Sequence, residues 1–334
     1  MSEPIRIAIT FKLNPEHIRR IKEVDPRIEI VDFPEEAYQR RDAELEPEVL
    51  ERAKRALANA DIMFGPGGVP KEFFDAATNL KWFQVINAGV DRLAAQGLLH
   101  RGFVVTNVSG LASVAIAEYV IGVMLMLCKG LHHAVRDQAQ HHWGFRFTPE
   151  LLGKTIGIAG MGAIGRETAR RARAFGMRVI ASRRTVTAGQ TDPDCDLLLP
   201  YSDLDTLLRE SDYLVLCVPL TPETTHMIGA AELAKMKPTA CIINIARGPV
   251  IDQPALIRAL KDGTIAGAAL DVTDPEPLPA ESELWDLPNV IITPHISGAV
   301  EGYGTRATEL FLRNLRHFVA GEPLENVVDP ALAY

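Results

Sequence analysis

The sequence predicts an α/β protein with two parallel sheets, the second of them doubly wound. The chain has 334 residues, which suits two medium-sized domains better than one. Apolar residues make up 47% of the chain, which is enough for two cores and too many for a disordered protein. Strand and helix patterns alternate along most of its length, and such alternation is typical of parallel sheets flanked by helices.

The first alternating series ends near residue 108. Its expected strands are Arg6–Thr10, Arg27–Phe33, Asp61–Phe64, Trp82–Asn87 and Phe103–Val108. The expected helices between them are Pro15–Val24 and Pro47–Ala60. A long apolar helix, expected over Val114–Gly130, then interrupts the alternation.

The second alternating series begins at Thr155 and contains six expected strands, enough for a complete doubly wound sheet. These strands are Thr155–Gly160, Arg178–Ser182, Tyr213–Val218, Ala240–Ala246, Ala266–Val272 and Val290–Thr293. The helices expected between them are Ala163–Phe175, Leu204–Glu210, Ala230–Met236 and Pro254–Lys261. A last helix is expected over Thr305–Ala320.

Composition and charge argue against several classes of protein. The net charge is −8 and no run of Lys and Arg is longer than a pair, so a nucleic-acid partner is not expected. The segment Ser113–Leu127 is too short to span a bilayer, and the first ten residues lack the features of a signal peptide. None of the four cysteines, Cys128, Cys195, Cys217 and Cys241, forms a CxxC pair. Cys217 and Cys241 lie in apolar strand-like runs, where a free thiol packs as a small hydrophobic side chain, and this pattern indicates a reducing, cytoplasmic setting.

Two histidine pairs, His132-His133 and His141-His142, raise the question of a metal site. Adjacent histidines on one helix point in different directions, and no nearby carboxylate cluster completes a coordination shell. No metal is therefore expected.

A glycine-rich segment carries the clearest functional signal. Gly160, Gly162 and Gly165 form a GxGxxG pattern between an apolar strand and an alanine-rich helix. In this context the first glycine permits a tight turn, the second lets the backbone approach a pyrophosphate, and the third lets the helix pack against the strand. The free N–H groups at the helix start then hold the phosphates. The sequence therefore predicts a dinucleotide site that includes Gly160, Met161, Gly162, Ala163 and Ile164.

The strand that follows the glycine loop ends in Ser182, Arg183 and Arg184. Sites that prefer NAD usually carry an Asp or Glu here to bind the ribose hydroxyls, and this sequence has no acid from Arg178 until Asp192. A forked guanidinium suits a 2′-phosphate. NADP(H) is therefore the preferred cofactor, with NAD as the alternative.

Three downstream segments bring an Arg, a Glu and a His to the ends of successive strands. Arg247 follows the fourth strand, Glu276 the fifth and His295 the sixth. Taken singly, each is more often a structural or surface residue. Ligands bind at the carboxyl ends of parallel strands, so their shared placement favours a joint role. Arg247 can bind a substrate carboxylate, His295 can donate a proton to a carbonyl as a hydride arrives, and Glu276 can hold the imidazole in its protonated form.

Taken together, these features resemble the D-isomer-specific 2-hydroxyacid dehydrogenase family. The resemblance spans most of the chain in the family's order. Beside the glycine loop, the matching pieces are Ala88–Asp91, Ala117-Glu118, Pro219–Thr224, Asn244–Gly248, Asp271–Pro277 and Pro294–Gly298.

The resemblance implies roles for further residues. Arg247, Glu276 and His295 become the catalytic residues, and Asp271 is expected to bind the nicotinamide carboxamide. The backbone amides of Ala88, Gly89 and Val90 are expected to bind the substrate carboxylate together with Arg247 and His295. The other residues expected along the cofactor are Val218, Pro219, Thr224, Ile245, Ala246, Arg247, His295 and Gly298.

The resemblance also implies a split architecture. A flavodoxin-like substrate domain, residues 1–108 and 300–334, is expected to be interrupted by a Rossmann cofactor domain, residues 109–299. The helix near Val114–Gly130 would help to form a homodimer. Asn87 and the glycine-rich stretch Phe64–Gly68 depart from the family's usual pattern, which leaves the space around the substrate's side group undetermined.

The expected activity is hydride transfer between a nicotinamide cofactor and C2 of a 2-oxo or 2-hydroxy acid, with glyoxylate or hydroxypyruvate as the expected kind of substrate. Formate oxidation is disfavoured because enzymes of this fold that oxidise formate usually have Gln at the position of Glu276. Phosphite oxidation and a nucleotide-sensing, corepressor-like role stay open as alternatives.

Overall fold

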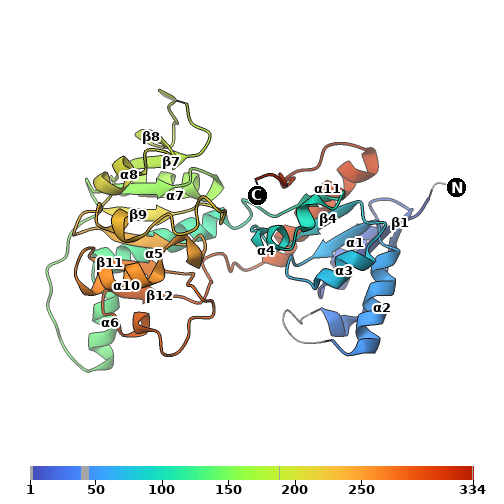
Figure 1. The fold of residues 1–334 in the computed structure, drawn as a ribbon, viewed down its shortest axis with the longest axis horizontal. Helices are drawn as coiled ribbons and strands as arrows, with labels where there is room; N and C mark the ends of the chain where they lie inside the picture. Colours follow the sequence, from blue (N-terminus) through green and yellow to red (C-terminus); the bar gives the residue numbers. More distant parts are fainter. Residues whose placement is uncertain (1–2, 39–44, 188, 333) are drawn as a thin grey trace. The chain divides into compact units, whose positions relative to one another are not determined.

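The computed structural model describes residues 3–38, 45–187, 189–332 and 334, which form two compact units. The first consists of Met1–Leu111 with Glu301–Tyr334, and the second of Ala112–Val300. The sequence placed the divisions close by, after residue 108 and before residue 300. Each unit is built around its own parallel sheet (Figure 1).

The first unit contains a five-stranded sheet in the order β2-β1-β3-β4-β5. This is the flavodoxin-like strand order, and it confirms the predicted fold class of this unit. The strands are β1 (Ile5–Ile9), β2 (Ile28–Ile30), β3 (Ile62–Gly65), β4 (Trp82–Val85) and β5 (Val104–Thr106). Its α-helices are α1 (Pro15–Lys22), α2 (Pro47–Ala58), α3 (Lys71–Ala76), α4 (Asp91–Ala95) and α11 (Tyr303–Ala320).

Alternating strand residues give this sheet two apolar faces. Met63 and Phe83 point into a cluster with α2 and α3, whereas Ile62, Phe64 and Trp82 point into a cluster with α1 and α11. Because successive side chains of a strand point to opposite faces, both faces must be apolar for helices to cover both. Helix α11 thus completes the core of a sheet whose strands all lie in the N-terminal third of the chain.

The second unit contains a seven-stranded parallel sheet in the order β12-β11-β10-β9-β6-β7-β8. The strands are β6 (Thr155–Ala159), β7 (Arg178–Arg183), β8 (Leu197–Pro200), β9 (Tyr213–Leu216), β10 (Cys241–Asn244), β11 (Gly267–Leu270) and β12 (Val290–Ile292). Strand order reverses between β6 and β9, where a doubly wound sheet binds its ligand. The predicted Rossmann fold is confirmed.

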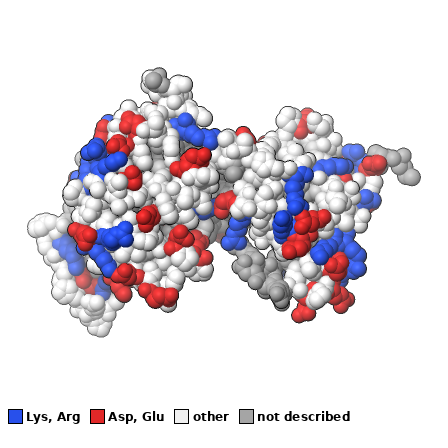
Figure 2. All heavy atoms as spheres, viewed as in Figure 1, with Lys and Arg blue, Asp and Glu red and all other residues white. Residues whose placement is uncertain are grey.

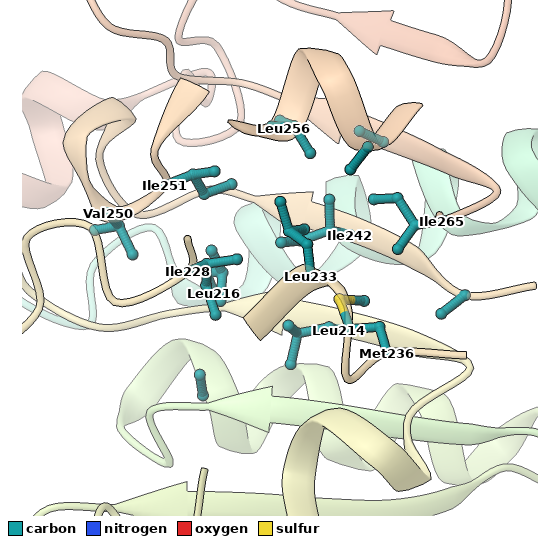
Figure 3. Packing of buried hydrophobic residues seen from close by; sticks show 14 of the residues in the cluster. Leu214, Leu216, Ile228, Leu233, Met236, Ile242, Val250, Ile251, Leu256 and Ile265 are labelled. Carbon is teal, nitrogen blue, oxygen red and sulfur yellow. The ribbon is translucent and has the colours of Figure 1, made fainter. Parts of the chain in front are cut away.

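Helices cover both faces of this sheet. Helices α5 (Ser113–Cys128) and α7 (Ala163–Ala174) pack on one face. Helices α8 (Leu204–Glu210), α9 (Ala230–Leu233) and α10 (Gln253–Lys261) pack on the other. Figure 3 shows this second core, in which Leu214 and Ile242 of the sheet meet Leu233 and Leu256 of the helices. The strand ends that carry the site therefore rest on a packed apolar core on both faces of the sheet.

Several elements were not predicted. Strand β8 is only four residues long and ends in a proline, so its pattern is too short to separate from a loop, and it makes the sheet seven-stranded. Helices α3, α4 and α6 (Leu131–Ala139) were also missed. Among the described residues no single helix has the length and hydropathy to cross a membrane; α5 and α6 pass such a test only as a pair bent by 68°. Figure 2 shows acidic and basic groups interspersed over the visible face of each unit.

Candidate active site

The glycine loop joins β6 to α7. Each of its three positions requires or permits glycine for a different physical reason. Gly160 has φ of +105°, and a Cβ there would lie 2.8 Å from the carbonyl oxygen of Cys217. A Cβ on Gly165 would lie 2.4 Å from the carbonyl oxygen of Gly160. These two glycines are required by the fold itself.

The packing of the fold does not require glycine at position 162. A Cβ there would have nothing within 4 Å, so the protein's own packing leaves the position free. Gly162 is the N-cap residue directly before α7, at the helix start where backbone N–H groups lack partners in the helix. Open space at a helix start is what a pyrophosphate requires, and the chain fits a dinucleotide here.

Met161 lies differently from its neighbours in the loop. Its side chain is 2% exposed and packs in the core, and its N–H donates to the carbonyl oxygen of Ser182 at 3.0 Å. Its part in the site is therefore to join the loop to the end of β7. Ala163 and Ile164 form the first turn of α7, beside the open position at Gly162.

Ser182 and Arg183 end β7 and Arg184 follows. The Ser182 side chain is buried, and the Nε atom of Arg183 is buried with no hydrogen-bond partner among the described residues. The Nη1 atom of Arg183 lies 3.8 Å from the Oδ2 atom of Asp192. Tertiary structure thus brings an acid back to the strand end where the sequence showed none.

Asp192 is already occupied by another arginine. Arg166 of α7 donates two hydrogen bonds to its carboxylate, at 2.9 and 2.7 Å, and the N–H of Asp194 donates a third at 3.0 Å. The Asp192 side chain is 5% exposed, and the Arg166 guanidinium holds its pKa below the usual range. The carboxylate is therefore buried in an ion cluster rather than presented to a ribose.

The loop after β9 is closed on itself. The hydroxyl of Thr224 donates to the carbonyl oxygen of Pro219 at 2.7 Å and accepts from the N–H of Thr221 at 2.8 Å. Val218 is 9% exposed at the base of this loop. These contacts give Thr224 a structural role in shaping the loop that the resemblance places along the cofactor.

Arg247 is carried by a turn that Asn244 organises at the end of β10. The Oδ1 atom of Asn244 accepts from the N–H of Ala246, and its Nδ2 donates to the carbonyl oxygen of Arg247, both at 3.0 Å. A Cβ on Gly248 would lie 1.9 Å from the carbonyl oxygen of Thr273, so only glycine lets this turn approach the loop after β11. Ile245 and Ala246 are buried beneath it.

Asp271, directly after β11, anchors the loop that carries His295. Its side chain accepts hydrogen bonds from the hydroxyl of Thr293 at 2.6 Å and from the N–H groups of Ile296 at 2.8 Å and Ser297 at 2.9 Å. The residue is 2% exposed. The Thr293 hydroxyl also lies 2.6 Å from that of Tyr119, whose pKa burial raises to about 12. Sequence reasoning did not detect this anchoring role.

His295 and Glu276, two of the predicted catalytic residues, are in direct contact through a hydrogen bond between their side chains. The Nδ1 atom of His295 lies 2.6 Å from the Oε1 atom of Glu276, and both side chains are about half exposed. His295 has φ of 54°, in the left-handed region, and its N–H donates to the carbonyl oxygens of Asp271 and Thr293. Because Nδ1 faces the carboxylate, Nε2 is the ring nitrogen that stays available for proton exchange.

Arg247, Glu276 and His295 follow β10, β11 and β12, so they lie at the carboxyl edge of three neighbouring strands. Gly298, at the end of the His295 loop, packs against Ile116 and Ala112 near the start of α5. Ala88, Gly89 and Val90 belong to the first unit, where they follow β4. Within the described residues, no group of three or more His, Cys, Asp or Glu side chains has a geometry that could hold a metal ion.

A glycine loop with open space at a helix start, and an imidazole–carboxylate pair at the same edge of a doubly wound sheet, define an NAD(P)-dependent oxidoreductase. Residues 121–297 match the family described as D-isomer specific 2-hydroxyacid dehydrogenase, NAD binding domain. The chain belongs to this family, and its resemblance at the sequence level is confirmed.

Relatives and solved structures agree. The chain is 36% identical over 287 residues to a glyoxylate reductase of Korarchaeum cryptofilum, covering 84% of this chain and 85% of that protein. It is 38% identical over 282 residues to a glyoxylate/hydroxypyruvate reductase B of Pectobacterium carotovorum, covering 82% and 87%. The crystal structure of a D-isomer specific 2-hydroxyacid dehydrogenase from Xanthobacter autotrophicus Py2, in complex with NADPH and MES, superimposes with a TM-score of 0.82 at 28% identity over the full length of both chains.

Proposed function

We propose that this enzyme reduces small 2-oxo acids, with glyoxylate and hydroxypyruvate as the expected substrates and NADPH as the preferred hydride donor. The observation that carries the proposal is the His295–Glu276 pair at 2.6 Å, held beside the Arg247 turn through the close approach of Gly248 to Thr273. The relatives named for glyoxylate and hydroxypyruvate support this substrate class.

Each residue has a distinct task in this scheme. NADPH, when bound, supplies the hydride. Arg247 binds the substrate carboxylate, and His295 donates a proton from Nε2 to the carbonyl oxygen. Glu276 accepts a hydrogen bond from Nδ1–H and stabilises the positive imidazolium before the proton is transferred. Asp271 holds the His295 loop, and we propose that it also faces the nicotinamide carboxamide.

The first unit offers a second set of donors for the carboxylate. The N–H groups of Ala88, Gly89 and Val90 make no hydrogen bond to any other described residue, and Ala88 is exposed. Consecutive free N–H groups in a turn form a site for an anion. We propose, as the resemblance implies, that they bind the substrate carboxylate.

The preference for NADPH follows from the end of β7. Arg183 has a buried Nε without a partner among the described residues, and a 2′-phosphate oxygen would satisfy it. Asp192 is engaged by Arg166 and is not presented to ribose hydroxyls. The related enzyme from Xanthobacter autotrophicus holds NADPH, which supports the same choice.

Exposed aromatic side chains favour a homodimer. Trp143, Phe145 and Phe147 are 97%, 79% and 94% exposed on an extended segment of the second unit. Such a run of apolar surface is costly in water and marks an interaction site. We propose that a second copy of the chain covers this exposed aromatic segment.

We also propose that the enzyme works in the cytoplasm, because its four free cysteines stay reduced there.

The test is to follow nicotinamide absorbance with NADPH or NADH and a panel of 2-oxo acids. We expect turnover with glyoxylate and hydroxypyruvate, a higher kcat/KM with NADPH, and loss of reduction in His295→Ala with unchanged cofactor binding. Tight NADPH binding without turnover of any 2-oxo acid would favour the corepressor-like role. Reduction of NADP⁺ by phosphite instead would favour phosphite oxidation. A kcat/KM with NADH equal to or higher than that with NADPH would contradict the proposal that Arg183 and Arg184 bind the 2′-phosphate.

A further inference from the structure

Two loops meet at the carboxyl edge of the first unit's sheet. One is the segment Gly65–Gly68 after β3, and the other is the segment Ile86–Val90 after β4. Strands β3 and β4 are neighbours in the sheet, so the two loops lie side by side. A substrate carboxylate bound by the second loop therefore places the rest of the substrate next to the first.

The Ile86–Val90 segment is held from behind. The hydroxyl of Tyr303 donates to the carbonyl oxygen of Ile86 at 2.8 Å. The Nδ2 atom of Asn107 donates to the carbonyl oxygen of Ala88 at 2.9 Å. These contacts engage carbonyl oxygens of the segment, whereas the N–H groups of Ala88, Gly89 and Val90 have no partner among the described residues.

The Gly65–Gly68 loop has few anchors of its own. Its sequence, Gly-Pro-Gly-Gly, contains no side chain that can hydrogen-bond. Its backbone is tied by the Gly65 carbonyl, which accepts from the N–H of Ile86 at 3.0 Å. The only side chain among the described residues that hydrogen-bonds to it is Asn87, whose Oδ1 accepts from the N–H of Gly67 at 3.0 Å.

We propose that Asn87 is a positioning residue that sets the enzyme's selectivity for the substrate's side group. It joins the wall formed by Gly65–Gly68 to the segment that binds the carboxylate, so the distance between wall and carboxylate is fixed. A glycine-rich wall would otherwise sample many conformations and accept side groups of many sizes. This inference rests on the proposed function, in which Ala88–Val90 bind the carboxylate of a 2-oxo acid.

The contacts around Gly67 and Gly68 indicate that the Gly65–Gly68 loop presents backbone atoms, not side chains, to the substrate. A Cβ on Gly67 would meet Leu93 and Val85 at 3.7 Å, and one on Gly68 would meet the guanidinium of Arg92 at 3.4 Å. Added side chains at these positions would thus point at the unit itself. The surface that the substrate's side group meets is backbone, and its position depends on the hydrogen bond to Asn87.

The experiment compares kcat/KM for glyoxylate with kcat/KM for a bulky 2-oxo acid, 2-oxoisocaproate. In Asn87→Ala we expect the ratio of the two to move toward unity by about tenfold or more, with the Kd for NADPH unchanged. Asn87→Asp keeps an acceptor oxygen, so it should keep the wild-type ratio within about threefold even if its charge weakens both substrates equally. Asn79→Ala removes a comparable hydrogen bond, to the carbonyl oxygen of Ala58, and serves as the matched control with an unchanged ratio.

The outcomes separate the two proposals. If the wild type reduces no 2-oxo acid, the proposed function fails. If it does, but Asn87→Ala folds and keeps the wild-type ratio, or the wild type itself shows no discrimination, the role of Asn87 is overturned. If Asn87→Ala does not fold, Asn87→Ser gives the same comparison, because its hydroxyl is too short to reach Gly67. A fall in kcat/KM by the same factor for both substrates would indicate a merely structural residue and would also overturn the proposal.

Discussion

Replacing Asp271 by asparagine tests whether this carboxylate holds together the loop that carries His295. In the structure it accepts three hydrogen bonds, from the hydroxyl of Thr293 and the N–H groups of Ile296 and Ser297, at 2.6 to 2.9 Å. Asparagine has the same shape, but its amide nitrogen cannot accept. Whichever way the side chain is placed, at least one buried donor loses its partner.

The size of the effect follows from these contacts. A charge-assisted hydrogen bond contributes about 1.5–3 kcal/mol, and a buried donor left without a partner costs about 1–3 kcal/mol. Removing the desolvation cost of a buried carboxylate offsets part of this loss. We therefore expect Asp271→Asn to lower the free energy of unfolding of the second unit by about 2–4 kcal/mol. We also expect kcat to fall, because the loop is what holds His295 at its unusual φ of 54°.

Urea unfolding monitored by circular dichroism measures the first quantity, and steady-state reduction of glyoxylate the second. Asp274→Asn is the matched control, since Asp274 lies in the same loop region and is exposed. A stability within about 0.5 kcal/mol of the wild type, with only the Kd for NADPH changed, would show that Asp271 acts on the cofactor alone and would refute the anchoring role.

Two further predictions concern the glycine loop and the ion cluster beside it. Gly162→Ala should keep the wild-type Tm within about 2 °C yet weaken NADPH binding at least about tenfold. Gly165→Ala should lower both the Tm and the affinity for NADPH, because its Cβ would meet the Gly160 carbonyl. Calorimetry and fluorescence titration measure these changes, and normal NADPH binding by Gly162→Ala would contradict the phosphate assignment. Asp192→Asn should cost about 1–2 kcal/mol at pH 7. The pKa of Asp192 is lowered in the folded protein, so this stabilisation is present above about pH 4 and is lost as the pH falls through the folded-state pKa. Urea titrations from pH 3 to 7 check it, and a difference between wild type and variant that does not shrink in acid would contradict it.

Much of the fold was predictable because local patterns agree with the global architecture. Apolar runs of four to six residues between amphipathic segments predict parallel strands and crossover helices, and the observed β6, β9 and β10 lie inside the predicted ranges. Strand β8 was missed because four residues ending in a proline carry too little periodicity. Its place beside β7 is decided by pairing, which sequence spacing does not encode.

The candidate site divides in the same way. The sequence alone determined the glycine loop and the order of Arg247, Glu276 and His295 along the chain, because each follows directly from a strand whose pattern is local. The positions of Asp192, Asp271 and Asn87 relative to their partners were decided only by tertiary structure, as those partners are 20 to 26 residues away. A hydrogen bond depends on a few tenths of an ångström between atoms of neighbouring strands and loops, and that distance is fixed by packing rather than by any pattern in the chain.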